Sequence, residues 1–128
     1  MGLVERIGYN IGMSDIQTYE EQRPWGLFRQ FVKNSPCTVK IITVNAGEAF
    51  RLQSHKNRTE FWHVLKGDGV MEIGDNKYDT KEGDEHLVEI GEKHRITGGQ
   101  SGIDILEIAT GDFDESDIIR FEDKYGRA

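Results

Sequence analysis

Four side chains with nitrogen and oxygen donor atoms stand at a spacing that suits metal binding: Gln53, His55, Glu60 and His94. Gln53 and His55 are two residues apart, so on a strand their side chains point to the same face. Glu60 follows after a short loop, and a hairpin would bring it opposite that pair. Together with His94 from a later strand, these donors suit zinc, manganese, iron(II), cobalt or nickel, and they do not discriminate among these ions.

Short runs rich in Val, Ile, Phe, Tyr and Thr must position these donors, and each run has the length of a strand. The predicted strands cover residues 25–32, 38–44, 49–55, 61–65, 69–73, 85–90, 95–97 and 103–109. Turn signals separate them, including glycines at 67–69 and 98–99. Many short strands at near-regular spacing indicate an antiparallel sandwich or barrel. The segment 114–121 fits either a short helix or a last strand.

The bulk composition predicts a single soluble domain. The chain has 128 residues, a net charge of −7 and one cysteine, Cys37, so an intrachain disulfide is impossible. An acidic chain lacks the basic surface that nucleic acid and anionic membranes require, and we expect neither as a partner. No apolar run reaches the roughly 18 residues of a membrane span, and the N-terminus lacks the apolar core of a signal peptide. We therefore expect a cytoplasmic protein.

Residues 1–22 are mixed and weakly patterned, unlike the segment that follows. We predict an N-terminal arm or extension over 1–22 and a barrel domain over 23–128. Barrels of this kind leave strand edges that tend to be covered, and the arm is long enough to cross onto a partner. Since two-fold dimers are the commonest soluble oligomers, we expect a homodimer.

The spacing around the four donors matches both sequence motifs of the cupin family. The positions that match the first motif are Gly47, Gln53, His55, Glu60 and Gly67, with glutamine in place of the usual first histidine. The positions that match the second motif are Gly83, Gly91 and His94, whereas Glu89 replaces its proline. This resemblance implies an all-β, single-domain cupin barrel (a double-stranded β-helix) that binds one divalent metal ion, with zinc as the first candidate.

More narrowly, the chain resembles the C-terminal cupin domain of type II phosphomannose isomerase/mannose-1-phosphate guanylyltransferase, as a stand-alone domain. The stretches that carry this resemblance are 23–26, 39–48, 52–62, 93–95 and 117–127. The resemblance implies an enzyme that interconverts mannose 6-phosphate and fructose 6-phosphate through an enediolate. The glycine-rich nucleotide loop of the guanylyltransferase part is not found in these residues, so we expect no nucleotidyl transfer from them.

Strand parity and this resemblance together select further candidate side chains. The candidate catalytic residues are Arg120, Lys40 and His86, and the candidate substrate-binding residues are Arg23, Arg51 and Trp62. Arg120 is the first choice for a phosphate contact, because it lies in the segment that resembles the C-terminal signature of the family. The general base stays open among His86, Glu48, Lys40 and a metal-bound hydroxide.

Two other functions stay open at this level. The chain could be another metal-dependent cupin enzyme, such as a sugar isomerase, an epimerase or a dioxygenase. Gln53 as a fourth ligand argues against oxygen activation, which needs open coordination sites. It could also be a non-catalytic sugar-binding cupin. Lys56, Asn57 and Phe61 stand where the family usually has histidines, and these departures favour the binding protein somewhat.

Overall fold

The computed structural model describes residues 4–5, 16–50, 52–111, 114 and 116–122, and every regular element in these ranges is a β-strand. The predicted all-β class is therefore confirmed. The chain divides into two compact units, residues 1–36 and 37–128. The predicted arm boundary after residue 22 falls inside a strand of the first unit. Among the described residues, no helix is long and apolar enough to cross a membrane.

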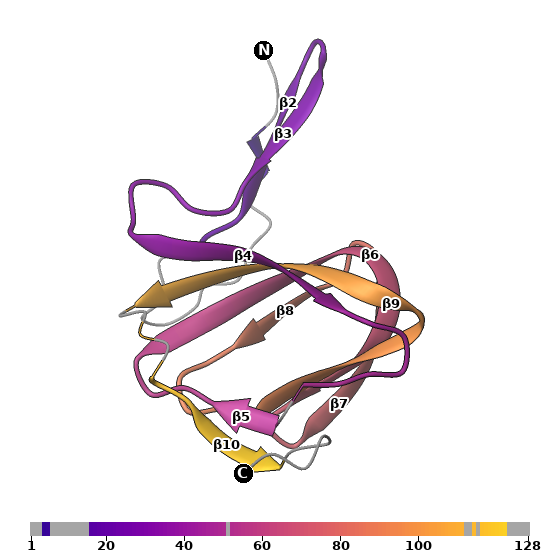
Figure 1. Cartoon of the computed structure of the whole chain (residues 1–128). Helices are drawn as coiled ribbons and strands as arrows, with labels where there is room; N and C mark the ends of the chain where they lie inside the picture. The colour runs from indigo at the N-terminus through magenta and orange to yellow at the C-terminus, as the bar shows by residue number, and fades with distance from the viewer. Residues whose placement is uncertain (1–3, 6–15, 51, 112–113, 115, 123–128) are drawn as a thin grey trace. The chain divides into compact units, whose positions relative to one another are not determined.

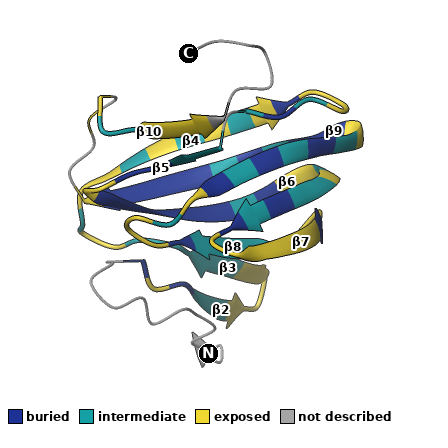
Figure 2. Ribbon diagram, turned by 90° about the horizontal axis from the view of Figure 1, so that it is seen from below, coloured by how far each residue is buried: buried dark blue, intermediate teal, exposed yellow. Residues whose placement is uncertain are grey.

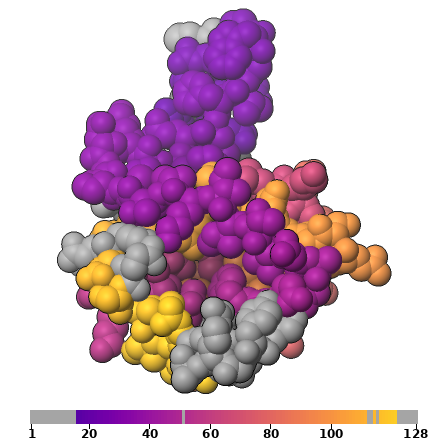
Figure 3. All heavy atoms as spheres, in the orientation of Figure 1, coloured from indigo at the N-terminus to yellow at the C-terminus, as the bar shows by residue number. Residues whose placement is uncertain are grey.

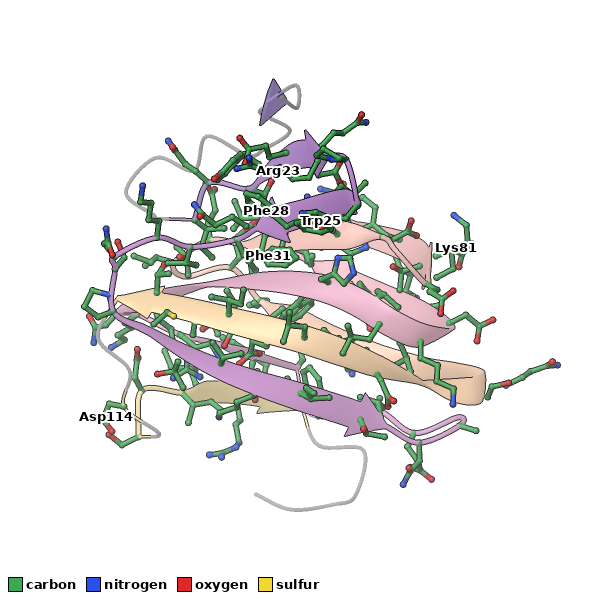
Figure 4. The ribbon with its side chains drawn as sticks, turned by 90° about the horizontal axis from the view of Figure 1, so that it is seen from above. Arg23, Trp25, Phe28, Phe31, Lys81 and Asp114 are labelled. Carbon is green, nitrogen blue, oxygen red and sulfur yellow. The ribbon has the colours of Figure 1, made fainter. Side chains whose placement is uncertain are left out.

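The first unit contains a small antiparallel sheet with the order β1-β2-β3. Its strands are β1 (Val4–Glu5), β2 (Tyr19–Arg23) and β3 (Gly26–Gln30). β2 and β3 form a tight hairpin, and Trp25 in its turn is 73% exposed (Figure 4). The sequence predicted a strand near β3 but not β2, because the Tyr-Glu-Glu-Gln-Arg run shows no apolar alternation.

The second unit contains the other seven strands. They are β4 (Cys37–Val44), β5 (Leu52–Ser54), β6 (Arg58–Ile73), β7 (Asn76–Lys81), β8 (Glu85–Val88), β9 (His94–Gly111) and β10 (Ile119–Glu122). They pair antiparallel in the order β10-β5-β9-β6-β7, with β4 also on β9 and β8 also on β6. Figure 1 shows β6 and β9 curving through this unit, so that each contributes to both of its sides.

β6 and β9 run continuously through the glycines at 67–69 and 98–99, where the sequence predicted turns. The ladder between the two strands shifts register near Gly67, which bends both strands. A Cβ atom on Gly67 would lie 2.1 Å from the carbonyl oxygen of Gly102, and Gly67 has a φ of +83°. Glycine is required here because the two backbones touch at the corner of the barrel. The predicted turns are therefore wrong, and the glycines bend long strands instead.

Two further strands were not assigned from the sequence. β7 is polar and mostly exposed, so it lacks the alternation that marks a half-buried strand, and its pairing with β6 defines it. The segment 114–121 fits either a helix or a strand by sequence, and in the structure residues 119–122 form the strand β10, paired with β5.

The core of the second unit is built from the inward faces of the strands. Burial alternates along β4, with Lys40, Ile42 and Val44 on the inner face and Val39 and Ile41 exposed. The buried core residues are Val44, Trp62, Val64, Met71, Ile73, Val88, Ile96, Ile103 and Ile105. Figure 2 shows that buried positions concentrate along β6 and β9. Polar groups on these inward faces are the exceptions, and they form the site described next.

Candidate metal centre

Three of the four predicted ligands meet inside the second unit. His55 follows β5, Glu60 lies near the start of β6, and His94 begins β9. Their candidate ligand atoms all lie within 4.8 Å of one another. Nε2 of His55 is 3.5 Å from Oε2 of Glu60, and Nε2 of His94 is 3.3 Å from Oε1 of the same carboxylate. All three side chains are at most 3% exposed, so the ligand cluster (His55, Glu60 and His94) is closed off from bulk water.

Gln53, the fourth predicted ligand, lies beside this cluster. It pairs directly with His94 across the β5–β9 ladder. Residues directly opposite each other on antiparallel strands project to the same face of the sheet. The Gln53 amide therefore shares the inner face with the His94 imidazole.

Backbone carbonyls orient both imidazole rings. Nδ1 of His55 donates to the carbonyl oxygen of Asp117 at 2.7 Å, and Nδ1 of His94 donates to that of Glu92 at 3.0 Å. A carbonyl oxygen only accepts, so Nδ1 carries the proton and Nε2 presents its lone pair to the cluster. Burial lowers the pKa of each imidazole to about 4, so both rings are neutral at physiological pH. This arrangement is the usual way in which a protein prepares a histidine for a metal ion.

The donor atoms of the cluster fit a divalent cation. Oε1 of Glu60 and Nε2 of His94 are buried and have no hydrogen-bond partner among the described residues. Buried polar atoms without partners are costly, and a cation between these two atoms would satisfy both. Two neutral imidazoles, a carboxylate and a neighbouring amide are common ligands of divalent transition metals.

Arg58 contacts the cluster, although the sequence assigned it no role at the site and only placed it in the resembling stretch 52–62. Its Nε donates to Oε2 of Glu60 at 3.2 Å, and its Nη2 donates to Nε2 of His55 at 3.1 Å. Its Nη1 donates to the carbonyl oxygen of Asp114 at 3.2 Å, and the side chain is only 6% exposed. Strand parity could have found it, because Arg58 stands two residues before Glu60 on β6 and shares its face.

A second carboxyl group, that of Glu107 on β9, also adjoins the cluster. It is 5% exposed, accepts a hydrogen bond from the Trp62 indole at 3.1 Å, and contacts the Glu60 carboxyl. Burial and the nearby charge of Glu60 raise the pKa of Glu107 to about 7. Burial also raises the pKa of Glu60, although the Arg58 charge opposes that shift. Strand parity could have found Glu107, because it stands two and four residues after Ile105 and Ile103, which point inward.

The predicted catalytic residues lie in different surroundings. Lys40 is on the inner face of β4, directly opposite Glu107. His86 is paired with Trp62, and its Nε2 lies 2.8 Å from the Thr80 hydroxyl. Arg120 pairs with Gln53 across the β5–β10 ladder, so the two side chains share a face. Its strand lies at the surface of the molecule, in yellow in Figure 3.

The predicted substrate-binding residues are Trp62, Arg23 and Arg51. Trp62 is fully buried, and the centroid of its ring is 5.5 Å from that of His94. Arg23 belongs to the first unit, where its guanidinium lies 5.7 Å from the centre of the Phe28 ring (Figure 4). Arg51 lies outside the described residues. Trp62 therefore lies beside the cluster, within the described part of the second unit.

A cleft in the second unit lies outside the ligand cluster. It has a volume of about 520 Å³ and is lined by residues of β6, β7 and β9 and of the loop before β8, including Asp68, Thr80 and Asp84. No ligand residue lines it. Thr80 in its wall is hydrogen-bonded to His86, which pairs with the buried Trp62.

Similarities to known proteins extend over most of the chain. The family described as mannose-6-phosphate isomerase C-terminal matches residues 12–123. A mannose-1-phosphate guanylyltransferase from Klebsiella pneumoniae is 36% identical over 110 residues, which are 84% of this chain and 23% of that protein. The chain thus spans about a quarter of the length of the curated relatives it matches.

Solved structures share the fold over much of the chain. A cupin protein from Bacteroides fragilis matches with a TM-score of 0.54 at 21% identity, over 69% of this chain and 90% of that one. The nucleoside dehydratase Pac13 from Streptomyces matches with a TM-score of 0.59 at 16% identity, over 94% of this chain and 86% of that one. These similarities confirm the predicted cupin fold, and at such identities they concern the fold alone.

Proposed function

Since the chain belongs to the mannose-6-phosphate isomerase C-terminal family, we propose that it is a metal-dependent isomerase of mannose 6-phosphate and fructose 6-phosphate. The observation that carries this proposal is the buried ligand cluster, in which both imidazoles are neutral and direct Nε2 inward. His55, Glu60 and His94 would hold the ion, and the Gln53 amide is on the same face. We propose zinc, because imidazole and carboxylate donors suit it well.

The residues around the cluster support proton transfer within a sugar. A bound divalent ion would polarise the sugar carbonyl and offset the negative charge that develops on an enediolate. Glu107 contacts Glu60 and stands opposite Lys40, so two groups able to hold a proton lie beside the ligands.

A direct test measures exchange of the C2 proton of mannose 6-phosphate in deuterated water, with metal-loaded protein. Isomerisation requires that proton to leave carbon, so deuterium should appear at C2 of the recovered sugar and fructose 6-phosphate should accumulate. If metal-loaded protein binds the sugar phosphate without exchange, the chain is a sugar-binding cupin. If it neither binds nor exchanges the sugar phosphate, the proposed substrate is wrong.

Arg120→Ala should weaken the use of mannose 6-phosphate by about tenfold to hundredfold. One charge-assisted hydrogen bond to an anion contributes roughly that much, and the register places Arg120 beside Gln53 on an exposed strand. KM for mannose 6-phosphate and the binding of unphosphorylated mannose measure the effect. Lys81→Ala is the control, since that exposed lysine pairs with Asp84 away from the ligand cluster. Equal losses for both sugars would remove Arg120 from phosphate binding.

We also propose that the protein is a homodimer, with the outer face of β4 in the interface. Val39 and Ile41 on this face are 55% and 66% exposed. Among the described strands, β4 pairs only with β9, which leaves its second edge open. A second copy of the chain would cover both features.

Light scattering at micromolar concentration should therefore give twice the chain mass. Ile41→Glu should shift the protein to monomer, because it places a charge in an apolar contact. Ile90→Glu is the matched control, since Ile90 is 52% exposed and lies outside β4. A monomeric wild type would refute the dimer, and an Ile41→Glu dimer would refute this interface.

A further inference from the structure

We propose that Arg58 is a resident cation of the ligand cluster, and that a metal ion binds only by displacing its guanidinium from His55 and Glu60. This inference rests on the metal site proposed above. It assigns to Arg58 a competing role, in which it holds the ligands in place while no ion is bound.

The hydrogen bonds of Arg58 go to the ligand atoms themselves. Its Nη2 donates to Nε2 of His55 at 3.1 Å, and its Nε donates to Oε2 of Glu60 at 3.2 Å. A neutral imidazole has one lone pair on Nε2, so this atom cannot accept from Arg58 and bind a metal ion at the same time. Loss of a proton from the guanidinium does not remove this competition, because arginine stays charged in proteins.

The two remaining donor atoms of the cluster are not occupied by Arg58. Among the described residues, Oε1 of Glu60 and Nε2 of His94 have no hydrogen-bond partner, although both are buried. An incoming ion would therefore find two donors available at His94 and Glu60, and two donors occupied by Arg58. Two cations in this closed space also repel each other, which adds to the cost of binding while Arg58 stays in place.

The geometry differs from that of an arginine that supports metal ligands from outside. A supporting group contacts the atom of the ligand that faces away from the metal. For His55 that atom is Nδ1, and the carbonyl of Asp117 already accepts its hydrogen bond at 2.7 Å. Arg58 instead contacts Nε2, the atom that would face the ion. Its third bond, from Nη1 to the carbonyl oxygen of Asp114, leaves the displaced guanidinium a partner nearby.

Removal of the guanidinium should tighten metal binding. After chelator treatment, Arg58→Met should bind Co²⁺ about tenfold to hundredfold more tightly than the wild type, because the ion no longer breaks two charge-assisted hydrogen bonds. Calorimetry measures the affinity, and the visible absorption of Co²⁺ reports its coordination. Arg58→Lys keeps the charge and should stay closer to the wild type than Arg58→Met does.

Arg95→Met is the matched control. Arg95 also pairs with a glutamate, at 2.7 Å from Glu72, but β9 directs it to the opposite face from His94. Its Co²⁺ affinity should equal that of the wild type. If Arg58→Met does not fold, Arg58→Gln carries the same expectation, since it also removes the charge.

The outcomes separate this inference from the metal site itself. If the wild type binds Co²⁺, His94→Ala does not, and the neutral Arg58 variants bind with equal or lower affinity, Arg58 supports the metal and the inference is wrong. If neither the wild type nor any Arg58 variant binds Co²⁺, the metal site and the inference both fail. Binding by Arg58→Met where the wild type shows none would support the inference most directly.

Discussion

His94→Ala should reduce the metal content of the purified protein from close to one divalent ion per chain to near zero. His94 is fully buried and supplies one of three donors that already lie within 4.8 Å of one another. Loss of a residue that merely orients a ligand weakens metal binding by about tenfold to hundredfold, so loss of a ligand should cost at least the upper end of that range. Elemental analysis and titration with Zn²⁺ measure the effect, and His55→Ala should behave in the same way.

His63→Ala is the matched control for this experiment. His63 lies on β6 beyond the cluster, and its Nδ1 is 2.7 Å from Oε2 of Glu85. It is partly exposed and is not one of the residues whose ligand atoms come together. This variant should keep its metal. Full metal content in both His55→Ala and His94→Ala would show that the cluster is not the binding site.

Glu107→Gln should change how the stability of the metal-free protein depends on pH. The pKa of Glu107 is raised in the folded state from 4.5 to about 7, by burial and by the charge of Glu60. A raised pKa contributes stability that is fully present below pH 4.5 and is lost as the pH rises through about 7. Between pH 5 and pH 8 the free energy of unfolding of the wild type should therefore fall by on the order of 2–3 kcal/mol relative to that of Glu107→Gln.

Urea unfolding of chelator-treated protein at the two pH values measures this difference. The neutral glutamine can still accept the hydrogen bond from Trp62, and the contributions of the buried histidines cancel in the comparison. Glu72→Gln is the control, because its pKa is lowered, mainly by Arg95, and its contribution is complete above pH 5. Parallel pH profiles for the wild type and Glu107→Gln would show that Glu107 ionises normally in the folded protein.

Strand parity predicted which side chains face the inside of the barrel wherever apolar and polar residues alternate along a strand. Lys40 lies on the inner face with Ile42 and Val44, as the alternation in that run predicted. The same alternation fails for β2 and β7, whose residues are polar on both faces. Those strands form because a partner strand completes their backbone hydrogen bonds. The local residue pattern does not indicate which segment that partner is.

The surroundings of the ligands could not be read from the sequence in the same way. Glu107 meets Trp62 across 45 positions of the chain, and Arg58 meets the Asp114 carbonyl across 56 positions. These contacts depend on how β6 and β9 bend at their glycines and on where the segment before β10 lies. A one-residue change in either register would turn these side chains to the other face.

The sequence by itself determined the all-β class and the family, and it selected the candidate ligand residues. These follow from local patterns, because a period of two places Gln53 and His55 on one face and the motif spacing adds Glu60 and His94. Only the tertiary structure decided the charge and protonation around those ligands. Burial makes both imidazoles neutral, raises the pKa of Glu107 and brings the Arg58 guanidinium onto the donor atoms. Desolvation and long-range contacts are properties of the folded barrel, and no local pattern encodes them.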